Sequence, residues 1–434
     1  MRIQAVAWRV VQETDLSHTP AGRWYFGWNI VAASSILTLL TVGLRMSIGP
    51  FFLPIAADLG FSRSMLATIV AVGMLFYGIG MPFVGQMVNH WGTRNVLLLG
   101  AALILTSILW AVMATGPISF LLSFGILLSL GLSCVSPVTF TPIIARWFTR
   151  QRGAALFFLS TGSMAGIALA TPVLGLSIPL WGWRDTLVGY AVLVALVTVV
   201  LAIWIMREDA PEGTDTLSGT KRTAATPATI AAPSLSLCAG DAIRSRPFWQ
   251  VVLGLFACGY SMNLLGAHGV PMLIDHGYDS VVASFGIGLI GFAAIFSTVV
   301  MGRMSDRLPR RNLLAAIYFI RGLGFFGLLM VSTQLQLYTV AILGGIVWAG
   351  SIALSSAILA DIYGIRLVGV LYGWTYLGHQ IGGMISSWLG GWAYETFGTH
   401  WIAFGSTGIL LFAAAWVSMR LPLPGQYIAQ PRAA

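Results

Sequence analysis

The chain has 434 residues, of which 57% are hydrophobic and only 9% are charged. Soluble globular proteins carry about 25% charged residues, so this composition excludes an ordinary water-soluble protein of this size. The formal net charge is +9, but the basic residues occur in short clusters between apolar runs. That pattern is typical of membrane-protein loops and excludes the continuous basic face of a nucleic-acid-binding protein.

Apolar runs long enough to cross a bilayer follow one another along the whole chain. The sequence therefore predicts an all-α membrane protein with twelve transmembrane helices. The expected helices are 27–54, 64–88, 95–115, 118–145, 153–177, 184–206, 248–274, 280–303, 312–332, 335–361, 366–393 and 400–420.

The distribution of Lys and Arg predicts the orientation of these helices. With a cytoplasmic N-terminus, 19 of the 23 basic residues fall on the cytoplasmic side, and only Arg63 and Arg184 fall in the opposite loops. Because cytoplasmic loops are enriched in Lys and Arg, both termini are expected in the cytoplasm and the protein in the inner (plasma) membrane. Residues 1–26 contain no apolar core of signal-peptide length, so they are expected to form a retained tail, as are residues 421–434.

The longest polar interruption, residues 207–246, is rich in Thr, Ala, Ser and Pro. It predicts a flexible cytoplasmic linker between a bundle at 27–206 and a second bundle at 247–420. Its last part, 235–246, has two interpretations, a disordered tether or a short interfacial helix that ends before Pro247.

The two halves carry related loops at equivalent positions, one after the second predicted helix and one after the eighth. Each loop contains a glycine, a short polar residue and a basic turn, so the halves are expected to form two pseudo-symmetric six-helix bundles. Tight basic turns alone would explain the arginines but not the placed glycines. The residues concerned are Gly85, Asn89 and Arg94 in the first loop and Gly302, Asp306, Arg307 and Arg310 in the second.

These loops resemble the signature of the major facilitator superfamily, Gly-x-x-x-Asp-Arg/Lys-x-Gly-Arg/Lys. The resemblance implies the major facilitator fold and a gating role for the loop residues. Asn89 replaces the acid of the first copy and Pro309 replaces a glycine of the second. The charged part of a gating contact is therefore expected to depend on Asp306 with a neighbouring arginine.

Further stretches resemble the monocarboxylate-transporter-like branch, which includes the oxalate/formate antiporters. The resemblance implies alternating-access transport of a small monocarboxylate or dicarboxylate, coupled to a proton or by anion exchange. The stretches are 43–52, 146–153, 182–184, 268–271 and 373–391.

Arg45 and Arg321 are the only basic residues in the interior of the predicted helices, away from their ends, and one lies in each half. An arginine at mid-membrane costs about 2.5–3.5 kcal/mol and is expected to face a wet cavity or a partner. All 14 acidic residues fall in tails, loops or helix ends, so an anionic substrate is the expected partner of both arginines. The alternatives are that Arg45 reaches the outer interface, and that Arg321 pairs with helix ends or Asp361.

Other polar residues lie at helical spacing in the predicted helices, where they would line a cavity and bind the substrate. Packing between helices is the alternative for each hydroxyl group. These residues are Thr41, Tyr260, Asn263, Tyr372 and Tyr376.

His268 and His379 lie in the interior of the predicted helices, and both are candidates to carry a coupling proton. The alternative is a neutral histidine that bonds a neighbouring helix. His379 is favoured because it shares a helical face with Tyr372 and Tyr376. Without an acid inside the helices, a proton or an exchanged anion is expected as the coupling partner, and not sodium.

The chain contains no phosphate-binding glycine loop, no histidine pair at metal spacing and no nucleophile-elbow serine, and its three cysteines have no metal or redox spacing. We therefore expect a transporter and not an enzyme, without cofactor or metal. The expected partners are a small carboxylate, the lipid bilayer and protons, with no nucleic acid, and the protein is expected to be a monomer. The alternatives are an exporter of hydrophobic or neutral compounds, favoured by the 12% aromatic content, and a non-transporting membrane sensor.

Overall fold

The computed structural model describes residues 25–148, 152–207, 239–305, 307–348 and 350–423, and these residues form helices and no strand. The sequence prediction of an all-α protein is therefore confirmed. The helices are α1 (Gly27–Met46), α2 (Gly49–Leu59), α3 (Arg63–Met113), α4 (Pro117–Phe120), η1 (Leu121–Leu127), α5 (Leu128–Cys134), α6 (Pro137–Trp147), α7 (Arg152–Trp204), α8 (Ala239–Ile243), α9 (Arg246–Asp275), α10 (Ser280–Ser305), α11 (Arg310–Met330), α12 (Gln334–Ile346), α13 (Gly350–Tyr363), α14 (Ile365–Phe397) and α15 (Trp401–Met419).

Two of these helices each contain two of the predicted transmembrane runs. The chain reverses inside α3 at Gly92 (φ 80°) and inside α7 at Gly182 (φ 76°). A positive φ is readily adopted by glycine, which has no Cβ, so these glycines allow sharp turns between two spans. Three other predicted runs are interrupted: α1 and α2 form the first, α4 to α6 the fourth, and α12 and α13 the tenth.

Helices long and apolar enough to cross a membrane occur nine times in the described part of the chain, counting α3 and α7 once each. The helix α14 is not among them, because its Gly, Trp, Tyr, His and Gln residues make it less apolar. Within the expected linker, residues 208–238 lie outside the described residues, and α8 lies where a short interfacial helix was one of the two interpretations.

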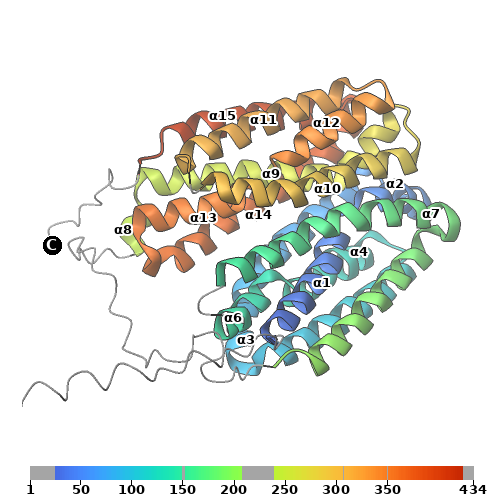
Figure 1. The fold of residues 1–434 in the computed structure, drawn as a ribbon. Helices are drawn as coiled ribbons and strands as arrows, with labels where there is room; N and C mark the ends of the chain where they lie inside the picture. Colours follow the sequence, from blue (N-terminus) through green and yellow to red (C-terminus); the bar gives the residue numbers. More distant parts are fainter. Residues whose placement is uncertain (1–24, 149–151, 208–238, 306, 349, 424–434) are drawn as a thin grey trace, which may run out of the picture.

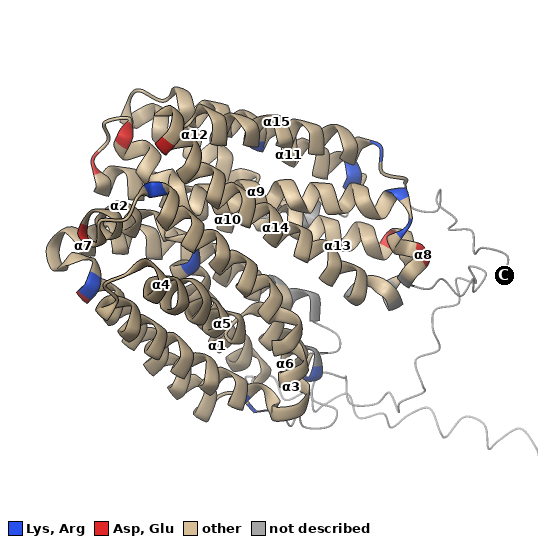
Figure 2. Ribbon diagram, turned by 180° about the vertical axis from the view of Figure 1, so that it is seen from behind, with Lys and Arg blue, Asp and Glu red and all other residues tan. Residues whose placement is uncertain are grey.

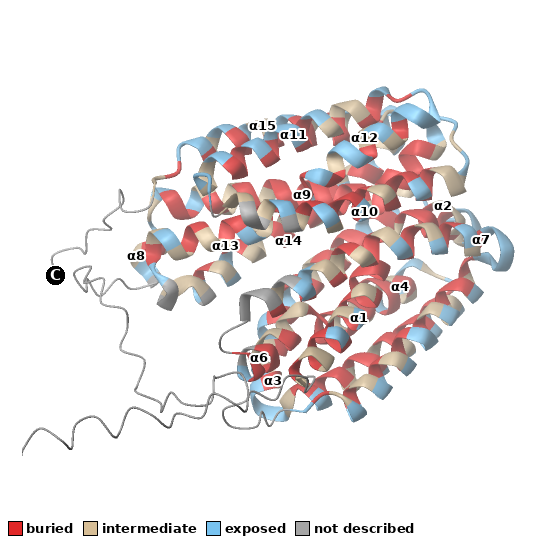
Figure 3. Ribbon diagram, viewed as in Figure 1, coloured by how far each residue is buried: buried red, intermediate tan, exposed pale blue. Residues whose placement is uncertain are grey.

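The helices form two bundles (Figure 1). Helices α1 to α7 make the blue-to-green bundle, and α9 to α15 make the yellow-to-red bundle. Each bundle has its own apolar core, which includes Leu37 and Phe140 in the first and Leu255 and Phe404 in the second. Buried residues follow the interior of both bundles, and exposed ones alternate with them on the outer faces (Figure 3).

The two bundles touch where α3 crosses α14 and where α7 crosses α10, and small residues allow this close approach. A Cβ on Gly391 would lie 2.3 Å from the Cβ of Ala67, and a Cβ on Gly291 would lie 2.5 Å from the backbone nitrogen of Ala168. The bundles lie together at the end of the molecule that carries α2, here called the α2 end. They diverge toward the opposite end, which carries α8 and is called the α8 end (Figure 1).

Charged residues lie mainly at these two ends of the molecule (Figure 2). The outer faces between the ends expose large apolar side chains, among them Phe83, Leu196 and Ile409. Such a band is the surface that a lipid bilayer covers.

Candidate functional site: a buried arginine between the two bundles

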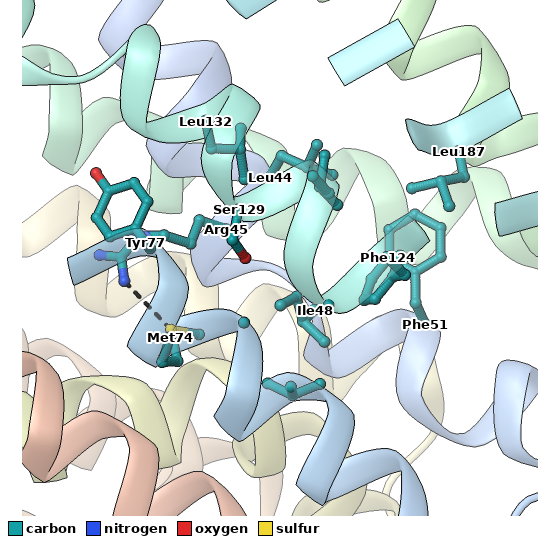
Figure 4. Close-up of a pocket in the computed structure, with 14 residues that line it drawn as sticks. Leu44, Arg45, Ile48, Phe51, Met74, Tyr77, Phe124, Ser129, Leu132 and Leu187 are labelled. Carbon is teal, nitrogen blue, oxygen red and sulfur yellow. Dashed lines mark hydrogen bonds between the residues drawn. The ribbon is translucent and has the colours of Figure 1, made fainter. Parts of the chain in front are cut away.

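Arg45 lies in the last turn of α1 and is only 8% exposed. Its Nη1 donates to Oδ1 of Asn263 in α9 at 3.0 Å and contacts Sδ of Met74 in α3 at 3.5 Å. The guanidinium lies over the ring of Tyr77, with Cζ 4.7 Å from the ring centroid, and Figure 4 shows it beside Met74 and Tyr77. Nε is buried without a hydrogen-bond partner. Arg45 therefore connects the two bundles through a neutral amide, and keeps a free donor.

The amide of Asn263 is oriented by its second hydrogen bond. Its Nδ2 donates to the carbonyl oxygen of Gly259 one turn earlier in α9, at 2.8 Å. This leaves Oδ1 to accept from Arg45. A carboxylate that displaced Asn263 would offer the guanidinium a stronger, charged acceptor.

A small cavity of about 30 Å³ lies beside Arg45 in the first bundle (Figure 4). This volume holds roughly one or two water molecules, so Arg45 is closely enclosed in this conformation. One wall is the π-helix η1, a type of turn that is frequent at functional sites. Apart from Arg45, Tyr77 and Ser129, the lining residues are apolar: Leu44, Ile48, Phe51, Val70, Gly73, Met74, Phe124, Gly125, Leu128, Leu132 and Leu187.

Helix α14 contributes the polar groups on the other side of Arg45. The ring of His379 stacks on that of Tyr376, with centroids 5.0 Å apart, and its Nδ1 lies 3.0 Å from Oε1 of Gln380. Nε2 of His379 is buried without a hydrogen-bond partner. Tyr376 packs against the core of the first bundle and interacts electrostatically with Arg45 and Tyr77. Arg45 thus lies near Asn263 and Tyr376, and His379 is connected to it through the ring of Tyr376. Tyr372 lies next to Tyr376, at 5.9 Å between ring centroids.

Arg321 is 1% exposed and lies inside the second bundle, in α11. Its Nη2 donates to the carbonyl oxygens of Val347, at 2.9 Å, and Trp348, at the break between α12 and α13. It also lies 3.3 Å from Oγ of Ser351, and Nη1 lies 3.4 Å from Sγ of Cys258. Arg321 therefore caps the negative end of α12, which was one of the two alternatives to substrate binding.

Asp361, the other alternative partner of Arg321, is paired elsewhere. Nη1 of Arg310 contacts both carboxylate oxygens of Asp361, at 2.6 and 2.7 Å. The pair joins the start of α11 to α13 within the second bundle. This contact excludes the proposed Arg321–Asp361 pair in this conformation.

Three predicted site residues make packing contacts away from Arg45. Thr41 donates to the carbonyl oxygens of Leu37 and Val135, both at 2.9 Å. The hydroxyl of Tyr260 lies 3.2 Å from that of Ser406 in α15. His268 bonds the carbonyl oxygen of Ser387 in α14 at 2.7 Å. These contacts agree with the packing alternatives for the three residues.

The predicted gating residues lie at the α8 end of the molecule. Asn89 and Arg94 flank the turn at Gly92 and are exposed, and a Cβ on Gly85 would lie 3.7 Å from Cγ1 of Val138, an ordinary packing distance. In the second loop, Arg307 is exposed and Arg310 pairs with Asp361. Gly302 lies within α10, and Asp306 lies outside the described residues.

Four residues of this region were not predicted. Tyr77 and Met74 form the wall beside Arg45. The side chain of Gln380, in the second bundle, donates to the carbonyl oxygen of Met74, in the first, at 3.5 Å. Cys258 contacts Arg321. Gln380 and Tyr77 are polar residues inside predicted helices, and that signal was available. Cys258 and Met74 give no such signal, because they are ordinary components of apolar helices.

A second polar cluster closes the α2 end between the bundles. Arg63, at the start of α3, makes two hydrogen bonds to the carboxylate of Asp275, at the end of α9, one of them 2.9 Å long. The guanidinium also lies 4.1 Å from the ring centroid of Tyr394, and Nε2 of His400 lies 2.9 Å from the same carboxylate. The backbone nitrogen of Ser64 donates to Glu395 at 2.7 Å. We call these residues the α2-end latch.

Comparisons with known proteins place this architecture in a family. The sequence profile of the Major Facilitator Superfamily matches residues 34–335 and 270–433. Solved structures of similar fold include a bacterial homologue of the human lysosomal transporter Spinster and a D-xylose–proton symporter. The first has a TM-score of 0.71 at 15% identity over 92% of this chain and 97% of the other, and the second has a TM-score of 0.69 at 15% identity over 93% and 99%.

Relatives in sequence include the uncharacterized MFS-type transporter YcxA of Bacillus subtilis (strain 168), 26% identical over 84% of this chain and 87% of the relative. Monocarboxylate transporter 13 of Rattus norvegicus is 25% identical over 93% of this chain and 90% of the relative. Monocarboxylate transporter 11 of Homo sapiens is 26% identical over 93% of this chain and 84% of the relative. Together with the two-bundle fold, these matches make the chain a multi-pass membrane protein that belongs to the Major Facilitator Superfamily, a family of transporters and not of enzymes.

Proposed function

We propose that the protein is a secondary active transporter of a small organic anion, a monocarboxylate or dicarboxylate. Its two bundles would move by alternating access, with coupling to a proton or by anion exchange. The observation that carries the proposal is Arg45, a buried cation between the bundles that contacts an amide, a thioether and a phenol ring in the described part of the chain. Relatives named monocarboxylate transporters support the same class of substrate.

The energetics of Arg45 favour an anionic ligand. A buried guanidinium prefers a carboxylate, with which it forms two parallel charge-assisted hydrogen bonds. Among the described residues, the carboxylates that form ion pairs are Asp58, Asp275 and Asp361, and each is paired with an arginine near a helix end. A substrate carboxylate would therefore complete the charge balance of Arg45, with Asn263, Tyr77 and Tyr376 as neighbouring polar groups.

The proposed orientation follows from the basic residues. Lys and Arg residues gather at the α8 end (Figure 2), and Arg94 follows the Gly92 turn while Arg307 and Arg310 lie at the turn into α11. The positive-inside rule therefore assigns the α8 end to the cytoplasm, together with both termini, in the inner (plasma) membrane. The α2-end latch then closes the site from the outside, and the conformation is inward-facing. A monomer remains the expected form, since each chain supplies both bundles.

The apolar lining of the cavity beside Arg45 favours a second candidate, an exporter of hydrophobic or neutral compounds. The two functions make opposite demands on Arg45. Carboxylate transport requires its charge, whereas a neutral substrate would be indifferent to it.

The test is uptake of radiolabelled lactate, pyruvate and oxalate into proteoliposomes that contain wild-type protein, Arg45→Lys or Arg45→Gln. Loss of the planar guanidinium should weaken binding of the substrate carboxylate by about 1–3 kcal/mol, so the KM should rise by roughly 5- to 150-fold. The Arg45→Lys variant, which keeps the charge, should be less affected than Arg45→Gln. Arg246→Gln is the matched control, because Arg246 is exposed at the start of α9 and is not among the predicted binding or gating residues, so the KM should stay unchanged. Wild-type KM values in both Arg45 variants, at equal protein content, would contradict the proposal.

A further inference from the structure

A thiol lies beside the second buried arginine. Cys258 in α9 is fully buried, and its Sγ lies 3.4 Å from Nη1 of Arg321 and 3.2 Å from Oγ of Ser351. A thiolate in this position would accept hydrogen bonds from both groups. Cationic neighbours stabilise the thiolate form of a cysteine, whereas apolar surroundings oppose it.

The other titratable groups around Cys258 are Arg321 and Tyr318 from α11, and Tyr372, Tyr376 and His379 from α14. None of them is a carboxylic acid. A thiol loses its proton more readily than a phenol, so Cys258 is the neutral group of this cluster best suited to become an anion. Among the described residues around Arg321, a thiolate at Cys258 would supply a countercharge.

His379 provides an independent sign that a proton can be exchanged here. Its Nε2 is buried without a hydrogen-bond partner, while Nδ1 bonds Gln380. The imidazole interacts electrostatically with Cys258 and stacks on Tyr376, which in turn interacts with Arg45. His379 therefore lies between the thiol and the proposed substrate site, with one nitrogen free to receive a proton.

We propose that the thiol of Cys258, beside Arg321, takes up and releases the coupling proton, and that His379 relays it. The inference rests on the proposed carboxylate transport. On release, the S–H bond breaks, its electron pair stays on sulfur, and the proton goes to Nε2 of His379. The resulting thiolate neutralises the charge of Arg321, and no oxidation occurs.

This arrangement explains how a proton and an anion would bind together. When the thiolate is protonated, Arg321 loses its countercharge, and the centre between the bundles becomes more positive. The affinity for a substrate carboxylate at Arg45 then rises. By thermodynamic linkage, the bound carboxylate raises the affinity for the proton by the same factor.

The chain contains a matched control for this role. Cys134 is also buried, but it lies in the first bundle in a cluster with Val84, Val88 and Val96. A change there removes a buried thiol without touching Arg321.

The transport experiment compares wild type, Cys258→Ser, Cys258→Ala, His379→Gln and Cys134→Ser in proteoliposomes. Serine keeps the hydrogen bonds of Cys258 but does not ionise near neutral pH. We expect both Cys258 variants to lose accumulation driven by a pH gradient by at least about tenfold, and to retain exchange at equal pH within about twofold. Retained exchange also shows that the variants are folded. Cys134→Ser should behave as wild type, and His379→Gln should slow accumulation.

The second readout is the ultraviolet absorbance of the thiolate, titrated from about pH 5 to about pH 8 on purified protein. Wild type should show an absorbance step that is absent in Cys258→Ser and retained in Cys134→Ser. Accumulation by Cys258→Ser at the wild-type level, or the absence of that step in wild type, would overturn the inference. Exchange without accumulation in wild type would also overturn it while leaving carboxylate transport intact. A wild-type protein that neither accumulates nor exchanges any carboxylate would contradict the proposed function itself.

Discussion

The two buried arginines of this chain are held in different ways, although both lie inside apolar helices. Arg321 donates to backbone carbonyl oxygens and to a thiol within one bundle, whereas Arg45 spans two bundles and contacts Asn263 of the other. Carbonyl oxygens at a helix end carry partial negative charge, so Arg321 is largely satisfied without a ligand. The contacts therefore favour Arg45 over Arg321 for the proposed role in substrate binding.

A change at Arg321 should consequently lower the folding stability of the protein more than its affinity for the substrate. Arg321→Lys retains the charge but loses the fork that contacts Val347, Trp348 and Cys258 at once. We expect a loss of about 1–3 kcal/mol of folding free energy, seen as a lower thermal midpoint of the purified protein in detergent. Arg307→Lys, at an exposed position, is the control. An unchanged midpoint together with a raised KM would instead assign Arg321 to direct substrate binding.

At the scale of helices, α9 and α14 approach each other at glycines. A Cβ on Gly259 would lie 1.8 Å from the carbonyl oxygen of His379, and a Cβ on Gly382 would lie 2.3 Å from that of Phe256. Both clashes are with backbone atoms, which cannot rotate away. These contacts position Asn263 and His379 around Arg45, so the spacing of the two helices determines the geometry of the site.

The alanine variant of Gly382 should therefore disrupt the site. Separation of α9 from α14 would weaken packing by about 1–3 kcal/mol and reduce transport. The matched control is Gly373→Ala in the same helix, because nothing lies within 4 Å of its Cβ position. Transport rate and thermal midpoint of the two variants give the comparison. Equal losses at both positions would show that the close approach of α14 to α9 at Gly382 is not responsible, because the gain in helix propensity from Gly→Ala is stabilising.

At the scale of the whole molecule, the α2-end latch joins the bundles through Arg63 and Asp275, whose side chains are 25% and 15% exposed. Partly exposed ion pairs contribute about 0.2–1 kcal/mol. Arg63→Gln should therefore raise the ratio of open to closed conformations at this end by no more than about fivefold. Spin labels on cysteines at Thr115 and Thr396, one on each bundle, measure the distance distribution. The same distribution in Arg63→Gln and wild type would show that the pair does not contribute to closure.

The latch should also respond to pH through His400, which lies outside the helices, directly before α15. Burial lowers the pKa of His400 below its ordinary value of 6.5, and the hydrogen bond with Asp275 offsets this effect only in part. Of the neighbouring groups, Asp275 favours the protonated form, and Arg63 and His276 oppose it. The closed state thus binds protons more weakly than an open state in which His400 is solvated.

It follows that acidification favours opening at the α2 end, beginning as the pH falls through 6.5. The label pair at Thr115 and Thr396 should report a larger open fraction at low pH in wild type, and a weaker response in His400→Gln. A full wild-type response in that variant would assign the effect to another group, such as the coupling site.

The sequence by itself determined the apolar runs, the one-sided distribution of basic residues and the isolation of Arg45 and Arg321 from every acid. These features are local in the chain, because bilayer length and desolvation cost act on each segment separately. The repeated loops and the family resemblance likewise depend on short segments.

Only the tertiary structure decided which of these residues meet. Arg45 and Asn263 are 218 residues apart, and Arg63 and Asp275 are 212 apart. Helical periodicity predicts which residues share a face, as for Tyr376 and His379, but not which neighbouring helix that face meets. The partners of Arg321 depend on the break between α12 and α13, and the role proposed for Cys258 depends on that arginine. Packing at a few glycines sets these distances, so the chemistry of the centre follows from helix spacing.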